Sequence, residues 1–127
     1  MTQQPRPSGA EVRRQVMGEA HISRLQDPFL APIYSVATDH AWGGVWVRDG
    51  LELKQRSLIV ISVLITLGRL TELAGHFGGA LRLGWTVDEL REVCIQTAPY
   101  AGFPAAIEAT RVLAEVVKAR EGDGRSA

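Results

Sequence analysis

Glu72 and His76 are the two residues whose types and spacing most directly suggest proton-transfer chemistry in this sequence. In a helix, residues four apart lie one above the other on the same face. A carboxylate that holds one ring nitrogen of a histidine selects its tautomer and raises its basicity, so that the other nitrogen can move a proton near neutral pH. The spacing predicts such a pair, although it is equally typical of a surface pair that stabilises a helix only slightly.

Two arginines and two tryptophans precede this pair in the sequence. Arg48 and Arg56 could each bind a carboxylate through a bidentate guanidinium, or they could be a loop-tethering ion pair and an exposed first-turn charge. Trp42 and Trp46 could form the wall of a dry pocket together with Phe77, or they could simply be core residues at a helix junction. The residue types therefore fit a carboxylate-binding site without requiring one.

The remaining polar candidates give weaker signals. His21 and His40 lie on segments separate from His76, without the close ligand spacing of zinc motifs, so no metal site is predicted. Tyr100, beside Gly102, could donate a phenolic hydrogen bond into a site or could pack at a turn.

Composition narrows the function classes. The 127 residues contain 14 lysines and arginines and 14 aspartates and glutamates, so no net field attracts nucleic acid or an anionic membrane. Cys94 is the single cysteine, which we expect to be a small buried hydrophobe because a reactive thiol needs exposure and a nearby positive charge. The absence of an internal disulfide and of an apolar signal-like run at the N-terminus favours a cytoplasmic protein.

The periodicity of apolar residues predicts an all-α fold of about six helices, because no segment alternates as a strand does. The predicted helices are residues 11–26, 28–40, 53–68, the segment around 69–86, a helix that starts after Thr86, and 104–120. We expect one helical domain over residues 10–121, with flexible tails at 1–9 and 122–127.

Some of these segments carry more detailed signals. Thr86 and Glu89 form a capping box, the clearest local signal in the chain. The helix at 53–68 is apolar on nearly every side and is therefore predicted to be buried all round. Residues 41–51, rich in glycine and tryptophan, fit neither helical nor strand periodicity and are predicted to form an ordered loop. The predicted inner faces of the last two helices are Val87, Leu90, Cys94 and Thr97, and Ile107, Thr110, Ala114 and Val117.

Several motifs in the same order resemble the 4-carboxymuconolactone decarboxylase family, part of the wider alkyl hydroperoxide reductase-associated (AhpD-like) group. The motifs are RRQVMGEAH at 13–21, AWGGVWVRDGL at 41–51, RSL at 56–58, TELAGHFGGALRLGWT at 71–86, and ELREV with YAGFPAA towards the end. The resemblance implies an all-helical subunit that decarboxylates 4-carboxymuconolactone to 3-oxoadipate enol-lactone in protocatechuate catabolism, without a cofactor. It also implies a homo-oligomer, a hexamer or a trimer, whose partner molecule is a small carboxylated lactone.

The family's glutamate and histidine fall on Glu72 and His76, and the histidine after its GEA motif falls on His21. The resemblance thus implies that His76, oriented by Glu72, returns a proton to carbon, while His21 or a backbone amide stabilises the oxyanion.

The family's tryptophan and arginine loop falls on Trp42, Trp46 and Arg48. Arg48, and with it Arg56, would then anchor the substrate carboxylate that is retained.

Three departures from the family pattern are visible, at Asp49, Gly75 and Pro99. Gly75 could change the volume of the pocket, and Pro99 could kink the helix that carries Tyr100. A thiol-based member of the wider group would need a CxxC pair near His76, where this chain has AGHF, so peroxidase and disulfide reductase chemistry are disfavoured. The remaining alternatives are a lyase or isomerase acting on a related lactone, and a non-catalytic helical binding or assembly subunit.

Overall fold

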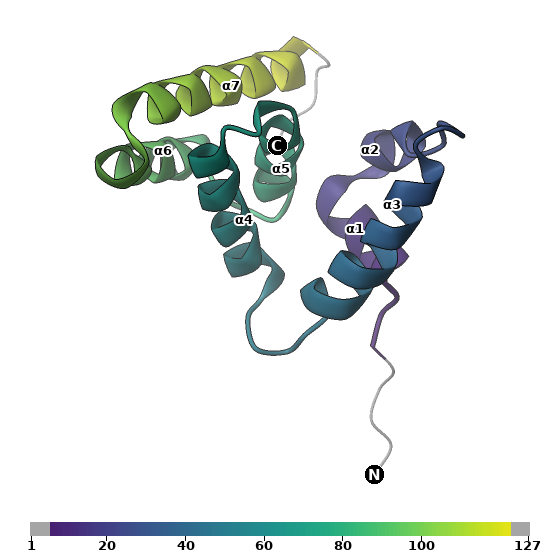
Figure 1. Cartoon of the computed structure of the whole chain (residues 1–127). Coiled ribbons are helices and arrows are strands. Elements are labelled where there is room, and N and C mark those ends of the chain that lie inside the picture. The colour runs from purple at the N-terminus through teal and green to yellow at the C-terminus, as the bar shows by residue number, and fades with distance from the viewer. Residues whose placement is uncertain (1–5, 123–127) are drawn as a thin grey trace. The chain divides into compact units, whose positions relative to one another are not determined.

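A computed structural model describes residues 6–122, and within that range every regular element is a helix. The all-helical prediction is confirmed. The chain divides into two compact units, Met1–Leu53 and Lys54–Ala127, which are purple to blue and teal to yellow in Figure 1. No helix in the described range is long and apolar enough to cross a membrane. The predicted single domain over 10–121 stays a prediction, and most of the two predicted tails, residues 1–5 and 123–127, lies outside the described residues.

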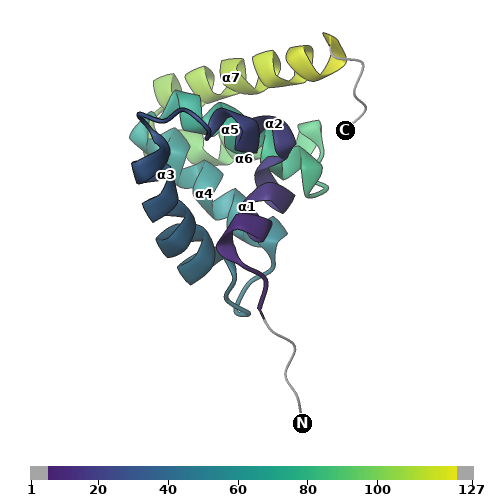
Figure 2. The same ribbon diagram turned by 90° about the vertical axis from the view of Figure 1, so that its right-hand side faces the viewer.

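The first unit contains three α-helices and one π-helix. They are α1 (Gly9–Met17), α2 (Glu19–Arg24), α3 (Ala31–Ala37) and η1 (Thr38–Trp46). The side-chain oxygen of Ser8 caps α1 by accepting a hydrogen bond from the amide of Glu11 at 3.1 Å. α3 continues into η1 without a break (Figure 2), so this half of the unit is one helical rod.

The predicted helix at 11–26 is interrupted at Gly18, which separates α1 from α2. Gly18 has φ 86° and ψ 165°, a conformation that glycine adopts and residues with a Cβ avoid. Its amide donates a hydrogen bond to the carbonyl of Arg14 at 2.8 Å, which ends α1. The apolar residues on both sides of Gly18 keep helical spacing, so the sequence pattern predicted one continuous helix and missed the turn.

The predicted ordered loop at 41–51 is wrong for its first half, because residues 38–46 form η1. A π-helix has i→i+5 hydrogen bonds, so its side chains follow neither the α-helical period nor the strand period used to interpret the sequence. The predicted helix at 28–40 correspondingly begins later, at Ala31, and continues through η1 to Trp46.

α1 and η1 approach each other so closely that glycine is required at the crossing. A Cβ added at Gly9 would lie 2.5 Å from both the backbone nitrogen of Gly43 and the backbone oxygen of Thr38. Because these are backbone atoms, the two helices would have to separate. We therefore expect Gly9→Ala to lower the free energy of unfolding by about 1–3 kcal/mol in urea denaturation followed by circular dichroism.

Gly44→Ala is the matched control for this prediction. Its added Cβ would have its nearest neighbour, the oxygen of Asp39, at 3.9 Å. We expect no loss of stability, since alanine also favours helical backbone over glycine. Equal stability of Gly9→Ala and Gly44→Ala would contradict the close crossing of α1 and η1.

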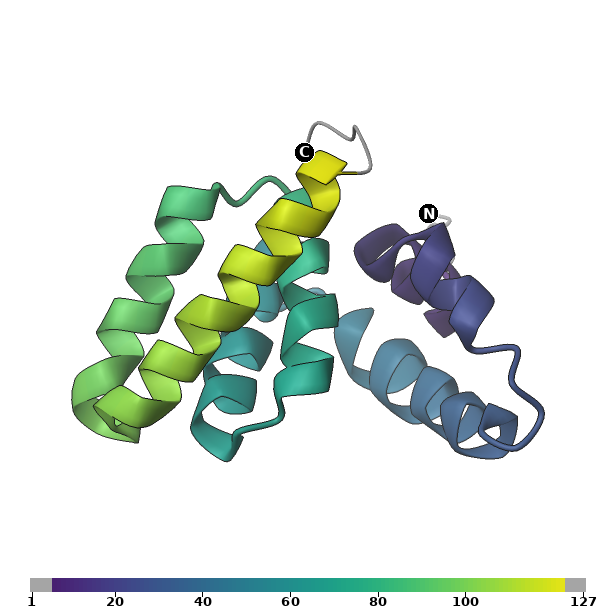
Figure 3. The ribbon, with the colours of Figure 1, turned by 90° about the horizontal axis from the view of Figure 1, so that it is seen from above.

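The second unit contains four α-helices: α4 (Leu53–Leu67), α5 (Leu70–Arg82), α6 (Val87–Ala101) and α7 (Phe103–Gly122). α6 and α7 turn back on each other at Gly102, and α7 also packs along α5, as Figure 3 shows from above. The buried core of this unit consists of Ile61, Ile65, Leu73, Phe77, Ala80, Leu81, Leu90, Cys94, Ala109 and Leu113.

The capping box at the start of α6 is present as predicted. The hydroxyl of Thr86 accepts a hydrogen bond from the amide of Glu89 at 3.0 Å, and the carboxylate of Glu89 accepts one from the amide of Thr86 at 2.9 Å. The backbone hydrogen bond from Thr86 lowers the pKa of Glu89. Since this carboxylate is stabilised when ionised, the cap contributes fully above the ordinary carboxyl pKa and weakens as the pH falls through the lowered one.

The prediction that the helix at 53–68 is buried all round is wrong. Only Ser57, Ile61 and Ile65, one stripe of α4, are buried. Ile59, Val63 and Leu67 are 52%, 49% and 61% exposed. The sequence could not show this, because an outward-facing apolar stripe has the same composition as an inward-facing one.

The predicted inner face is correct at the centre of α6 but wrong for α7. In α6, Leu90 and Cys94 are buried as expected. In α7, the buried residues are Ala106, Ala109 and Leu113, whereas Ile107 is 47% exposed. The predicted face of α7 is therefore rotated about one residue from the observed one, because small alanines form the inner contact.

Candidate active site

The predicted site residues divide between the two units. The first unit carries His21, Trp42, Trp46 and Arg48, and the second carries Arg56, Glu72, His76 and Tyr100. The assembly of these two groups into one site stays a prediction.

α5 carries the Glu72–His76 pair. The helix has apolar anchors at Leu73 and Phe77, both 0% exposed, which fix its orientation in the second unit. Glu72 is exposed, whereas His76 is half-buried and its Nδ1 atom is shielded from solvent. One helical turn separates the two residues, so they share a face of α5 on which a carboxylate can orient an imidazole.

Arg56 lies in the first turns of α4. Its side chain is half-buried and its Nε atom is shielded from solvent. Arg56 is therefore not an exposed first-turn charge, which was the alternative to a carboxylate-binding role. The adjacent Ser57 is fully buried, and its hydroxyl has no hydrogen-bond partner within residues 6–122. The sequence interpretation did not single out Ser57, because nothing in its spacing distinguishes it from a helix-surface serine.

The tryptophans are brought together by η1. The rings of Trp42 and Trp46 stack with centroids 4.5 Å apart and an interplanar angle of 16°, and both side chains are buried. Arg48 lies two residues after the end of η1 and is exposed. His21, on α2, is half-buried with its Nε2 atom shielded from solvent. The first unit thus has an aromatic stack and two groups that can interact with a carboxylate or an oxyanion.

Arg13, on α1, is a buried arginine within the RRQVMGEAH motif that was not among the predicted site residues. Its side chain is only 7% exposed. The Nη1 atom donates hydrogen bonds to the carbonyl of Tyr34 at 3.3 Å and to the hydroxyl of Thr38 at 2.8 Å. A pattern of apolar residues around Arg13 on α1 was the available signal, since it places the arginine on the inner face with Val12 and Val16.

Tyr100 lies near the end of α6, one residue after Pro99. Its side chain is 87% exposed. The structure therefore places the phenol on the surface of the second unit, and a hydrogen bond from it to a ligand stays a prediction.

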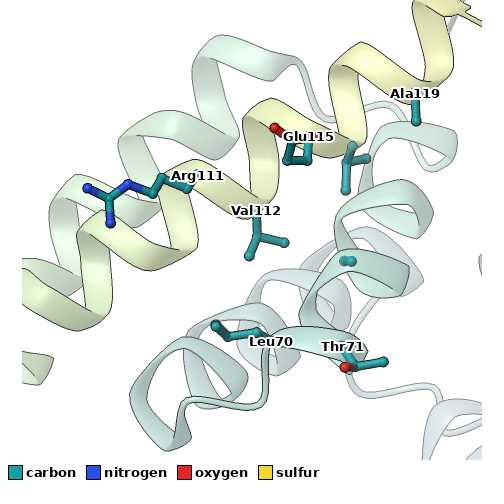
Figure 4. A pocket seen from close by; sticks show the side chains of 8 residues that line it. Leu70, Thr71, Arg111, Val112, Glu115 and Ala119 are labelled. Atoms are coloured by element: carbon teal, nitrogen blue, oxygen red, sulfur yellow. The ribbon is translucent and has the colours of Figure 1, made fainter.

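An open groove of about 490 Å³ lies between α5 and α7. Figure 4 shows Val112 on the α7 side and Leu70 and Thr71 on the α5 side, while the guanidinium of Arg111 extends away from the space between them. The eight lining residues include none of the predicted site residues. The lining is mostly apolar, and its charged residues, Arg111 and Glu115, include no histidine that could move a proton near neutral pH, so we do not place the chemistry there.

Potential metal ligands do not gather in the described range. Within residues 6–122, no three histidine, cysteine, aspartate or glutamate side chains lie close enough together to hold a metal ion.

Cys94 is fully buried on the inner face of α6. Burial raises the pKa of its thiol above the ordinary value, so the thiolate fraction at neutral pH is reduced. We expect a thiol-specific disulfide reagent not to label Cys94 within minutes in the native protein at pH 8. In about 6 M guanidinium chloride, which unfolds the protein, we expect one equivalent of label per chain. Cys94→Ala gives the blank, and fast native labelling would contradict the buried position.

Residues 31–115 match the model of the carboxymuconolactone decarboxylase family. The chain is 41% identical over 114 residues to the 4-carboxymuconolactone decarboxylase of Acinetobacter baylyi, covering 87% of this chain and 84% of the relative. It is 38% identical over 112 residues to the nitrosuccinic acid decarboxylase npaB of Metarhizium robertsii, covering 86% of this chain and 78% of the relative.

Both relatives are decarboxylases by name, and this chain is an enzyme of the same carboxy-lyase type. Together with the match over residues 31–115, these similarities show that the chain belongs to the carboxymuconolactone decarboxylase family.

Proposed function

We propose that the protein decarboxylates 4-carboxymuconolactone to 3-oxoadipate enol-lactone, a step of protocatechuate catabolism, without a cofactor. The observation that carries this proposal is the 41% identity to the Acinetobacter baylyi decarboxylase, which extends over 84% of that relative. The acid–base pair and the cationic side chains of this chain supply groups for each step.

The substrate itself can accept the electrons. When the carbon–carbon bond to the departing carboxylate breaks, CO2 leaves and its electron pair spreads through a carbon–carbon double bond to the lactone carbonyl. The enzyme must then anchor the second carboxylate, stabilise the negative charge on the carbonyl oxygen, and return a proton to carbon.

His76 is the proposed proton donor to carbon, and Glu72 is the proposed residue that orients it. The half-buried position of His76 supports this role, because a partly exposed imidazole can reach a bound ligand and can be reprotonated from water after each turnover. The one-turn spacing of Glu72 on the same face of α5 supports its orienting role.

The other predicted residues are proposed to bind the substrate. Arg48 and Arg56 would anchor a carboxylate, and His21 would donate a hydrogen bond to the oxyanion, with a backbone amide as the alternative donor. Trp42 and Trp46 are proposed to exclude water from the departing carboxylate, which their buried, stacked rings support. Tyr100 remains the least supported member because of its exposure.

Nitrosuccinic acid is the second candidate substrate, favoured by the 38% identity to the fungal decarboxylase. In nitrosuccinic acid, a nitro group on the carbon that loses CO2 can accept the electron pair, and a proton is then returned to that same carbon, whereas in the lactone the proton goes to the carbon beside the carbonyl. Both substrates therefore need the same acid and the same anchoring of a retained carboxylate. A lyase or isomerase reaction on a related lactone would also use this set.

Proton NMR time courses with each substrate test the proposal directly. Purified, chelator-treated protein is mixed with 4-carboxymuconolactone in one tube and with nitrosuccinic acid in another, against no-protein controls. We expect rapid conversion of the lactone. Preferential conversion of nitrosuccinic acid would make the second candidate the function, and no conversion of either would overturn both.

We also propose that the protein forms a homo-oligomer, a hexamer or a trimer. The exposed apolar stripe of α4, formed by Ile59, Val63 and Leu67, supports association because monomers rarely expose contiguous apolar surface. Light scattering coupled to size-exclusion chromatography measures the mass, and a monomer across the micromolar range would contradict the proposal. The cytoplasmic location expected from the single cysteine stays a prediction.

A further inference from the structure

Arg13 is a cation held inside the first unit without an anionic partner. Its two hydrogen bonds both run from Nη1, to the carbonyl of Tyr34 and the hydroxyl of Thr38. The Nε atom is shielded from solvent and has no hydrogen-bond partner within residues 6–122. The ion pairs in that range involve other arginines, so Arg13 contacts no carboxylate there.

Two aromatic rings flank the guanidinium. Its central carbon lies 5.6 Å from the ring centroid of Tyr34 and 5.7 Å from that of Trp42. Trp42 in turn stacks on Trp46. These rings provide cation–π attraction, but they leave the positive charge of Arg13 uncompensated by an opposite charge.

The neighbouring Arg14 shows how unusual this arrangement is. Arg14 is about half exposed and pairs with Glu19 at 2.9 Å, as surface arginines commonly do. Burial, by contrast, lowers the pKa of Arg13, partly offset by Tyr34. Removing a charge from water without a counter-ion is unfavourable, so the position of Arg13 is best explained by an anion that binds to it.

η1 helps to build this arrangement. Thr38 and Trp42 reach Arg13 from successive turns of the π-helix, a conformation that is frequent at functional sites. The close crossing of Gly9 and Gly43 holds α1 against η1. The guanidinium is thus fixed in orientation before any ligand arrives, which reduces the entropy lost on binding.

We propose that Arg13 binds the carboxylate that the substrate retains, through guanidinium N–H groups that its hydrogen bonds to Tyr34 and Thr38 do not use. A carboxylate is the anion whose planar shape matches the guanidinium fork. The identity of this ligand rests on the proposed function, in which both candidate substrates carry two carboxyl groups. Arg13 is assigned the retained group because a cation bound to the departing carboxylate would stabilise the ground state more than the transition state.

Succinate, an unreactive dicarboxylate, separates binding from turnover. Isothermal titration at constant ionic strength measures its affinity for the parent, Arg13→Gln and the control Arg14→Gln. We expect Arg13→Gln to weaken binding about 10- to 100-fold, the effect of losing hydrogen bonds to a charged group, and Arg14→Gln to change it less than about 2-fold. Unchanged affinity in Arg13→Gln, or no binding of succinate to the parent, would overturn the proposal.

Arg13→Lys covers the case in which the glutamine variant does not fold. Lysine keeps the charge but loses the planar fork, so we expect about a 10-fold loss of succinate affinity. A lysine variant that is merely less stable, with parental succinate affinity, would show that Arg13 is structural and overturn the proposal. Sulfate binding as tight as succinate binding would overturn the assignment to a carboxylate.

Kinetics supply the second readout. In the decarboxylation assay, Arg13→Gln should raise KM about 10- to 100-fold while kcat changes less than about 3-fold, since binding is lost equally in ground and transition states. A protein that binds succinate through Arg13 but converts neither candidate substrate would defeat the proposed function alone. Turnover with parental KM in Arg13→Gln would defeat this inference alone.

Discussion

His76→Gln is expected to lower kcat by about 100- to 10,000-fold, the range that a general acid contributes. Glutamine is similar in length to histidine and keeps a hydrogen-bond donor and acceptor, but it cannot carry an extra proton near neutral pH. The half-buried position of His76 on α5 allows this exchange without leaving a large cavity. The measurement is kcat by NMR on the preferred substrate.

Two controls separate chemistry from structure. Circular dichroism and thermal unfolding of His76→Gln should match the parent, because the neighbouring core anchors of α5 are unchanged. Glu72→Gln should reduce kcat less than His76→Gln does and should shift the pH profile of kcat, as expected for a residue that acts through the imidazole. If folded His76→Gln turns over within a few-fold of the parent, His76 does not donate the proton.

The helices of the second unit were the most predictable part of the chain. The capping box at Thr86 locates the start of α6, and the end of α4 and the end of α6 fall at glycines with positive φ. These signals act through neighbouring residues in the sequence, so they can be read without the tertiary structure. The family motifs predicted the decarboxylase family for the same reason, because they are local patterns in a fixed order.

The first unit was less predictable because its key features are not local. The π-helix η1 has a hydrogen-bonding period that ordinary patterns do not detect. The apolar neighbours of Arg13 on α1 place it on the inner face, but its burial and hydrogen bonds also depend on α3 and η1 packing against α1, which no local pattern reveals. The same holds for Ser57, whose hydroxyl lies buried in the second unit.

The inner face of α7 shows a different limit. Apolar size suggested Ile107, but the chain places Ala106 and Ala109 inside. Small residues let two helices approach closely, so the contact face can be the one with the smaller side chains. Hydrophobicity alone therefore misplaced the face by about one residue.

Phe77→Ala is expected to have the largest effect on stability, a loss of about 3–5 kcal/mol in the free energy of unfolding. The ring is 0% exposed and belongs to the core cluster that joins α5 to α6 and α7. Its removal leaves a cavity between packed helices that can collapse only partly. Against a total stability of about 5–15 kcal/mol, the variant should be close to unfolding at 37 °C.

Phe103→Ala is the matched control, since it removes the same ring from a position that is 66% exposed in the same unit. We expect a change within about 0.5 kcal/mol, measured by urea denaturation at one fixed protein concentration. The sequence also suggested that Phe77 excludes water from the substrate, and kcat of the still-folded variant at low temperature tests that role. If Phe77→Ala is no less stable than Phe103→Ala, α5 is not anchored through this ring, and the orientation of His76 must depend on other contacts.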